Sequence, residues 1–214
     1  FNHPMELIQR ADVAMYEAKK RGGNSWLWYE SKLDERLSFH VALRTQIQEA
    51  LQHEQFELFY QPIMTAAGRI AGVEALIRWQ HPERGYISPA AFIPVAERTG
   101  QIVPISDWVL RQACRDLERL KPYGIGSMSV NFSPIQFYRD DFIEKVKSTL
   151  KRYEIQPGEL TAEITENVLV HDTQRITELL EQLRELGLDV AIDDFGSGFA
   201  SLRYLNSLPV NKLK

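Results

Sequence analysis

Short apolar segments alternate with helical patterns along most of this chain, and this alternation constrains the fold more than any other feature. Segments with strand character begin near residues 128, 160, 189 and 210, at intervals of about 20 to 30 residues, the spacing typical of β/α units in a parallel sheet. Before them, residues 55–63 and 69–79 are two apolar runs joined by a turn. These two runs predict an antiparallel hairpin.

Counted with the hairpin, the pattern predicts six strands, whereas a closed (β/α) barrel has eight strands over roughly 250 residues. We therefore expect an α/β barrel that lacks about two units at its C-terminal end. An open doubly wound sheet is the rival fold. Its glycine-rich phosphate turn should follow the first strand, where this chain has TAAGRI at residues 65–70 instead, so the barrel is favoured.

Helix signals fall between the expected strands. Ser88 as a cap, Pro89 at the first helical position and Gly100 at the exit predict a helix between them, because these residue types are preferred at those places. Further helices are expected at residues 106–120, at residues 142–150, between a cap at Asp172 and a stop at Gly187, and in a short segment that ends at Leu205.

The first 30 residues form a piece that cannot fold alone. Residues 6–20 have apolar side chains at helical spacing, and SWLWYE at residues 25–30 is β-like. One helix and one strand bury too little apolar surface for a core of their own. A charged amphipathic helix is predicted over residues 31–51. Because the chain begins without methionine and ends in the opening of a strand, we expect a segment of a longer protein.

Composition argues against several function classes. The chain carries 25 basic and 29 acidic residues, a net charge of −4, so no overall positive field attracts a nucleic-acid polymer. No apolar stretch approaches the roughly 20 residues of a membrane-spanning helix, and the first residues lack signal-peptide features. The single cysteine, Cys114, lies among apolar residues. It predicts a packing role in a reduced compartment, and we expect a cytoplasmic location.

Polar residues stand at the ends of otherwise apolar strands, where β/α barrels carry their reactive groups. They are Glu74, Asn131, Glu163, Asp193 and Asp194. Oxygen ligands of this kind suit hard divalent cations such as Mg²⁺, Mn²⁺ or Ca²⁺. Two adjacent aspartates cannot face the same side of a regular strand. We therefore expect the strand to end there, with Asp193 on one ion and Asp194 on a second.

Each of these residues also has a plain structural interpretation. A single carboxylate at a strand end is usually a cap or a surface group, and only the set as a whole favours a metal site. Lys214 alone is a strand lysine whose stem lies along apolar surface. Arg78 is either a phosphate ligand or one half of a surface ion pair.

Five motifs in register resemble the EAL domain family. They are YQPI at residues 60–63, EALIRW at 74–79, NFS at 131–133, EITE at 163–166 and DDFGSGFASL at 193–202. The stretch ADVAMYEAKKRGGN at 11–24 is similar to the last helix of a GGDEF domain. The resemblance implies the C-terminal remnant of a GGDEF domain over residues 1–30, a linker helix over 31–49, and a C-terminally truncated EAL domain over 50–214.

The resemblance implies a TIM-like barrel with an antiparallel first strand, of which about six of eight strands are present. It also implies a phosphodiesterase that converts cyclic di-GMP to linear pGpG with Mg²⁺ or Mn²⁺. The residues that match the family's functional positions are Glu74, Asn131, Glu163 and Asp193 for one metal ion, Asp194 for the second, Lys214 for the attacking water, Glu166 for support of the DDFGSGF loop, and Gln61, Leu76 and Arg78 for the nucleotide. An upstream GGDEF domain in the same polypeptide and a homodimer are the expected partners.

Two other functions are open at this point. The first is a binding module that senses cyclic di-GMP or docks a partner without cleaving the nucleotide. The family's later glutamate and glutamine motifs would lie beyond Lys214, so the chain itself does not decide between cleavage and binding. The second is an unrelated metal-dependent lyase on the same barrel, which would require five motifs in register to coincide.

Overall fold

The computed structural model divides the chain into two compact units, Phe1–Glu49 and Ala50–Lys214. It describes residues 31–166, 168, 173–196 and 208–214, together with residues 8, 10–12, 14, 15, 18, 24 and 26–29. Within helix α2 (Ser31–Gln52) the side chains are described from residue 42 onward. Asp172 and the short helix expected to end at Leu205 lie outside the described residues.

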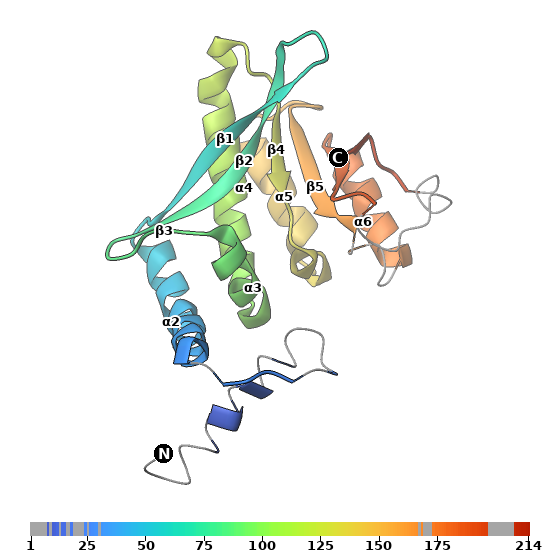
Figure 1. Ribbon diagram of the computed structural model, residues 1–214. Helices are drawn as coiled ribbons and strands as arrows, with labels where there is room; N and C mark the ends of the chain where they lie inside the picture. The colour runs from blue at the N-terminus through green and yellow to red at the C-terminus, as the bar shows by residue number, and fades with distance from the viewer. Residues whose placement is uncertain are drawn as a thin grey trace. The chain divides into compact units, whose positions relative to one another are not determined.

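The second unit is built on one mixed sheet (Figure 1). Its strands are β1 (Phe56–Met64), β2 (Ile70–His81), β3 (Gly85–Ile87), β4 (Met128–Asn131), β5 (Leu160–Thr165), β6 (Asp189–Asp193) and β7 (Lys212–Leu213). β1 pairs antiparallel with β2, which confirms the predicted hairpin, and β4 to β7 follow parallel to β2. β3 was not predicted because three residues are too few for an alternating pattern.

The strand order β1-β2-β4-β5-β6-β7 never reverses direction. Because each parallel crossover is right-handed, such an order places the connecting helices on one face of the sheet. Figure 1 shows α4, α5 and α6 in a row along that face. A doubly wound sheet would instead reverse its order at a switch point and carry helices on both faces. The described topology therefore fits part of a TIM-like barrel.

The helices follow most of the predicted boundaries. They are α3 (Pro89–Thr99), α4 (Ile102–Leu120), α5 (Phe142–Arg152) and α6 (Thr173–Glu185), with 3-10 turns η1 (Lys121–Tyr123) and η2 (Pro134–Tyr138). Gly100 ends α3 in the left-handed conformation as expected, but the Ser88 side chain makes no capping hydrogen bond. α4 begins four residues before the predicted Ser106, because Pro104 is tolerated in a first helical turn.

Aromatic rings fill the core between the hairpin and the helices. Phe56, Trp79 and Phe92 are almost fully buried and contact one another, with ring centroids 5.4 to 5.6 Å apart. Cys114 on α4 is fully buried, and this burial raises its pKa to about 12, with the Glu118 carboxylate adding to the shift. The thiol is therefore a packing group, as the sequence predicts.

A close backbone approach joins the hairpin to the parallel strands. A Cβ atom on Gly72 would lie 2.8 Å from the carbonyl oxygen of Ser127. This distance is too short for a carbon–oxygen contact, so no residue with a side chain fits at this position. The next residue, Val73, donates its backbone N–H to that same oxygen at 3.1 Å. Glycine at position 72 thus lets β4 dock beside β2, and this contact sets the register of Glu74, two residues further along.

One prediction for the first unit was wrong. Residues 26–29 within the β-like SWLWYE segment form no strand, since no described strand pairs with them. Trp26 and Trp28 are both exposed and meet edge to face, with centroids 5.4 Å apart. Among the described residues, no helix is long and apolar enough to cross a membrane.

Candidate active site at the carboxyl ends of the strands

The strand register places five predicted site residues on the same face of the sheet. Asn131 of β4 lies opposite Glu163 of β5, and Glu74 of β2 lies opposite the residue two before Asn131. Asp193 and Lys214 fall on this face by the same two-residue alternation along β6 and β7. This face is the one that the helices leave open, so these polar groups converge away from the aromatic core.

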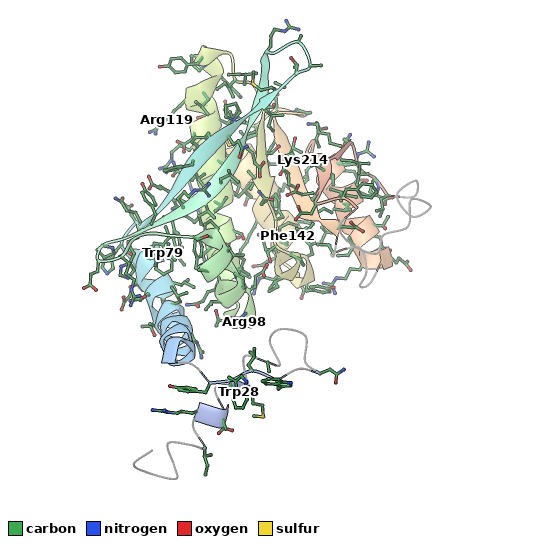
Figure 2. All side chains as sticks on the ribbon, in the orientation of Figure 1. Trp28, Trp79, Arg98, Arg119, Phe142 and Lys214 are labelled. Atoms are coloured by element: carbon green, nitrogen blue, oxygen red, sulfur yellow. The ribbon has the colours of Figure 1, made fainter. Side chains whose placement is uncertain are left out.

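Lys214 connects the polar residues of two strands, β2 and β5. Its ammonium contacts the Glu163 carboxylate and lies 3.0 Å from Oε2 of Glu74. The side-chain amide of Asn131 donates to Oε1 of Glu74 at 2.9 Å. The backbone of Lys214, which is labelled in Figure 2, is held in place by a hydrogen bond to the carbonyl of Ile192 at 2.8 Å. Side chains from β2, β4 and β5 and from the residue after β7 therefore meet in one polar cluster.

Glu163 is the most perturbed member of this cluster. Its side chain is 0% exposed, and burial raises the pKa of its carboxyl, while hydrogen bonds with Lys214 and Ser129 pull the pKa down in part. For Lys214, burial disfavours the ammonium, yet the hydrogen bonds with Glu163 and Glu74 outweigh burial and raise the pKa. Two carboxylates thus share one ammonium, so negative charge is in excess and further positive charge would be stabilised there.

Ser129 is a member of this cluster that sequence reasoning missed. Its side chain is buried and lowers the pKa of the neighbouring Glu163 carboxyl. It lies two residues before Asn131 on β4, so the alternation of a strand places both side chains on the same face. That alternation was the available signal.

The chain leaves β6 at the predicted place. The strand ends at Asp193, and Asp194 has a backbone φ of +56° in the left-handed region, which aspartate tolerates better than most residues. Asp193 therefore has the extended backbone of the strand, whereas Asp194 has a left-handed backbone, so the alternation of side chains stops between them. Just beyond, the backbone N–H of Gly196 donates to the buried Glu166 carboxylate at 3.0 Å. This is the contact that a loop-supporting role for Glu166 requires.

The predicted set of metal ligands is only partly gathered. Among the described residues, no three Asp, Glu, His or Cys side chains lie together closely enough to hold a metal ion. Asp193 lies opposite Thr165, two residues beyond Glu163, which shifts its backbone about 7 Å along the sheet. The ammonium of Lys214 also holds the space between Glu74 and Glu163. Carboxylate oxygens are also the ligands that hard divalent ions prefer, so a position that holds one cation between two carboxylates has suitable donors for such an ion.

The three predicted nucleotide contacts continue along the hairpin. Gln61 lies opposite Glu74 in the β1–β2 register, and Leu76 and Arg78 follow at two-residue steps on the same face. Arg78 donates from Nη1 to the carbonyl of Ile77 at 2.8 Å. Leu76, Arg78 and Asn131 also line a hollow of about 510 Å³ that extends toward α3 and η2, a size within the range of small-molecule sites.

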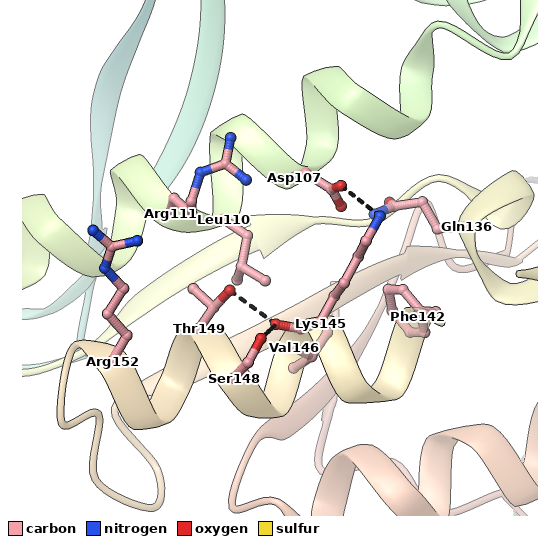
Figure 3. A pocket seen from close by; sticks show the side chains of 10 residues that line it. All are labelled: Asp107, Leu110, Arg111, Gln136, Phe142, Lys145, Val146, Ser148, Thr149 and Arg152. Carbon is pink, nitrogen blue, oxygen red and sulfur yellow. Dashed lines mark hydrogen bonds and ion pairs between the residues drawn. The ribbon is translucent and has the colours of Figure 1, made fainter. Parts of the chain in front are cut away.

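A second hollow lies between α4 and α5, on the helix side of the sheet (Figure 3). Its central lysine, Lys145, is paired with Asp107 at 2.9 Å and with Asp141 at 3.1 Å. The hydroxyls of Ser148 and Thr149 donate to the Lys145 carbonyl. These polar groups satisfy one another, so this hollow is separate in place and in chemistry from the polar cluster at the strand ends.

The chain belongs to the EAL domain family, whose model matches residues 44–214. The bifunctional diguanylate cyclase/cyclic di-GMP phosphodiesterase MucR of Pseudomonas aeruginosa is 39% identical over 98% of this chain and 31% of its own length. The cyclic di-GMP phosphodiesterase NbdA of the same organism is 37% identical over 98% of this chain and 27% of its own length. The chain thus spans about a quarter to a third of these relatives.

A solved structure of the MucR phosphodiesterase in complex with c-di-GMP matches the fold with a TM-score of 0.76. The two chains are 39% identical, and the match covers 80% of this chain and 71% of the MucR chain. The two chains are therefore similar in sequence as well as in fold over the matched region.

Proposed function

We propose that this chain carries most of the active site of a divalent-metal-dependent phosphodiesterase that hydrolyses cyclic di-GMP to linear pGpG. The observation that carries the proposal is the cluster of Lys214, Glu74, Glu163 and Asn131, which meets on the open face of the sheet from β2, β4, β5 and the residue after β7. Family membership and relatives that are cyclic di-GMP phosphodiesterases support it.

In this proposal, the ligands of one Mg²⁺ or Mn²⁺ ion are Glu74, Asn131, Glu163 and Asp193, and Asp194 helps to hold a second ion. The chemistry that two such ions supply is neutralisation of the phosphate charge and a lowered pKa for water. Glu163 contributes a buried carboxylate, and positive charge beside it offsets the cost of that burial. A divalent cation beside the two carboxylates would add the positive charge that a single ammonium does not fully supply.

The remaining residues orient the reactants. The Lys214 ammonium, now on Glu74 and Glu163, is placed to donate a hydrogen bond to the attacking water. Arg78 offers a fixed charge to a phosphate oxygen, because its guanidinium is held by the Ile77 carbonyl. Gln61 and Leu76 lie between these groups on the hairpin face and would contact the nucleotide. Glu166 would keep the loop that follows Asp194 in place through Gly196.

We infer the organisation of the longer protein from the same resemblance. Residues 1–30 would be the C-terminal end of a GGDEF domain in the same polypeptide, residues 31–49 a linker helix, and residues 50–214 part of the EAL domain. Cyclic di-GMP would be the ligand, and a cytoplasmic location and a homodimer through the EAL domain are further parts of this proposal.

A binding-only protein is the second candidate. The observation in its favour is the incomplete gathering of carboxylates among the described residues, with an ammonium between two of them. Such a protein would bind cyclic di-GMP and use the occupied state as a signal, without a metal-dependent step.

Incubation of the full-length protein with cyclic di-GMP and Mn²⁺ separates the two candidates. We expect pGpG to appear on anion-exchange chromatography, to vanish when EDTA removes the metal, and to be absent with the Glu163→Gln variant. A wild-type protein that binds cyclic di-GMP in calorimetry but forms no pGpG would contradict hydrolysis and support the binding-only protein.

A further inference from the structure

The hairpin face that carries Gln61, Leu76 and Arg78 continues outward into two aromatic side chains. Phe59 of β1 lies opposite Leu76, and Tyr86 of β3 lies opposite the residue two beyond Arg78. The register therefore places both rings on the same face as the candidate nucleotide contacts. They extend the candidate site toward the outer rim of the sheet.

The two rings are exposed, unlike the aromatic residues on the other side of the hairpin. Phe59 is 45% and Tyr86 is 57% exposed, whereas Phe56 and Trp79 are 5% exposed or less. The Phe59 and Tyr86 rings meet edge to face, with centroids 5.8 Å apart. Neither ring fills the core. Each therefore forgoes much of the stabilisation that a buried aromatic side chain gains when it is removed from water.

Charged groups hold these rings in position. The Arg78 guanidinium lies over the Phe59 ring, 5.5 Å from its centroid, at a distance typical of cation–π contact. The Tyr86 hydroxyl hydrogen-bonds the Glu57 carboxylate, and this bond raises the pKa of Tyr86. Phe59, Tyr86 and Arg78 thus form a pre-arranged surface, which we call the rim platform.

The rim platform lies at a suitable distance from the polar cluster. Phe59 is opposite Leu76, which is two residues along β2 from Glu74, a rise of about 7 Å. In a nucleotide one ribose separates the phosphate from the base. A phosphate at the polar cluster would therefore direct an attached base outward along the hairpin, toward the aromatic rings and the Arg78 guanidinium.

We propose that Phe59 and Tyr86 form a stacking platform for one guanine base of the cyclic dinucleotide, with Arg78 between that base and its phosphate. This inference rests on the proposed function and adds two residues that none of the sequence motifs singles out for binding. The rings act on bound substrate as binding groups. They stabilise the ground state and the transition state equally, so their loss should change KM and leave kcat unchanged.

The test uses Phe59→Leu and Tyr86→Leu in the full-length protein, with cyclic di-GMP as substrate. We expect each variant to raise KM about tenfold, since one base–aromatic stack is typically worth that much, with kcat within about twofold of wild type. Phe59→Tyr keeps the ring and should therefore raise KM less than Phe59→Leu does. Tyr123→Leu removes a tyrosine from η1 that is even more exposed, at 82% against 57% for Tyr86, and is the control.

Unchanged KM values in both leucine variants would overturn the platform, as would an equal rise in the Tyr123→Leu control. A loss of kcat at constant KM would overturn it too, because that result assigns the rings a structural role. If the wild-type protein forms no pGpG, hydrolysis fails but the platform is still tested: calorimetric Kd values for cyclic di-GMP should rise about tenfold in the leucine variants. Absence of any wild-type binding overturns both proposals.

Discussion

Lys212 in β7 and Lys214 just after its end make different contacts on the same face of the sheet. Lys212 and Lys214 are two residues apart, so their side chains lie on one side of the strand. Lys212 pairs with Asp189 at 2.9 Å and donates to the Thr161 hydroxyl at 3.1 Å, near the amino ends of β5 and β6. Lys214 contacts Glu74 and Glu163, which lie further toward the carboxyl ends of the parallel strands.

The difference lies in burial and in charge balance. The Lys212 pair has one carboxylate for one ammonium, and both partners are partly exposed, at 49% and 30%. The Lys214 cluster has two carboxylates for one ammonium, and Glu163 is fully buried. A partly exposed, balanced pair contributes little to stability, whereas a buried, unbalanced cluster costs free energy unless a further cation or ligand joins it. The carboxyl end of the sheet is thus built for binding and the amino end for folding.

The Glu163→Gln substitution is expected to have the largest effect, and it tests whether the Lys214 cluster serves binding. We expect kcat/KM for cyclic di-GMP to fall on the order of 10³-fold, about 4 kcal/mol of transition-state stabilisation. The neutral amide fits the same space and removes a buried charge, so the Tm should stay constant or rise. Steady-state kinetics and thermal unfolding of the same preparation check both parts. An active variant would contradict a role for Glu163 in the site.

The next largest effect is expected for Lys214→Met. Without the ammonium, Glu74 and the buried Glu163 carboxylate lose their partner, and we expect the free energy of unfolding to drop by about 3 kcal/mol. Activity should fall about 100-fold. The double variant Lys214→Met/Glu163→Gln is the control: it should recover stability, measured by urea unfolding, without recovering activity. Independent, additive stability effects would show that the two side chains do not interact.

A smaller effect is expected for Glu166→Ala, which removes the carboxylate that accepts the Gly196 N–H. The loop after Asp194 would then lose one anchor, and we expect kcat to fall about tenfold through misplacement of the neighbouring aspartate. The dependence of activity on Mn²⁺ concentration is the measurement. The half-saturating Mn²⁺ concentration should rise if Glu166 positions a metal ligand, and an unchanged value would assign Glu166 to the fold alone.

The smallest effect is expected for Lys212→Met, the counterpart of Lys214→Met two residues earlier. The free energy of unfolding should change by less than about 1 kcal/mol, because the pair with Asp189 is partly exposed. Activity should match wild type within experimental scatter. A loss of activity comparable to that of Lys214→Met would remove the distinction between the two ends of the sheet.

Much of this organisation could be predicted from local patterns. Alternating apolar residues predicted β1 and β2, and the hairpin that joins them is confirmed. Gly100 predicted the end of α3, because few other residues adopt its left-handed conformation. Such features depend on residues close in sequence. The predictions failed where strand pairing decides the outcome: residues 26–29 have strand composition but form no strand in the part of the chain that the structure describes, and β3 pairs with β2 although it has only three residues.

The candidate site divides along the same line. The sequence by itself identified the polar residues of the site, since Glu74, Asn131, Glu163 and Asp193 each interrupt an apolar run. Their expected place at the strand ends is confirmed for Asn131 and Asp193 and is wrong for Glu74, because β2 continues to His81. Only the tertiary structure decided that Lys214, 140 residues away, contacts Glu74, that Glu163 is fully buried, and that Phe59 and Tyr86 extend the same face. The reason is physical: residue type sets what a side chain can bind, whereas strand register and burial set its neighbours and the cost of its charge.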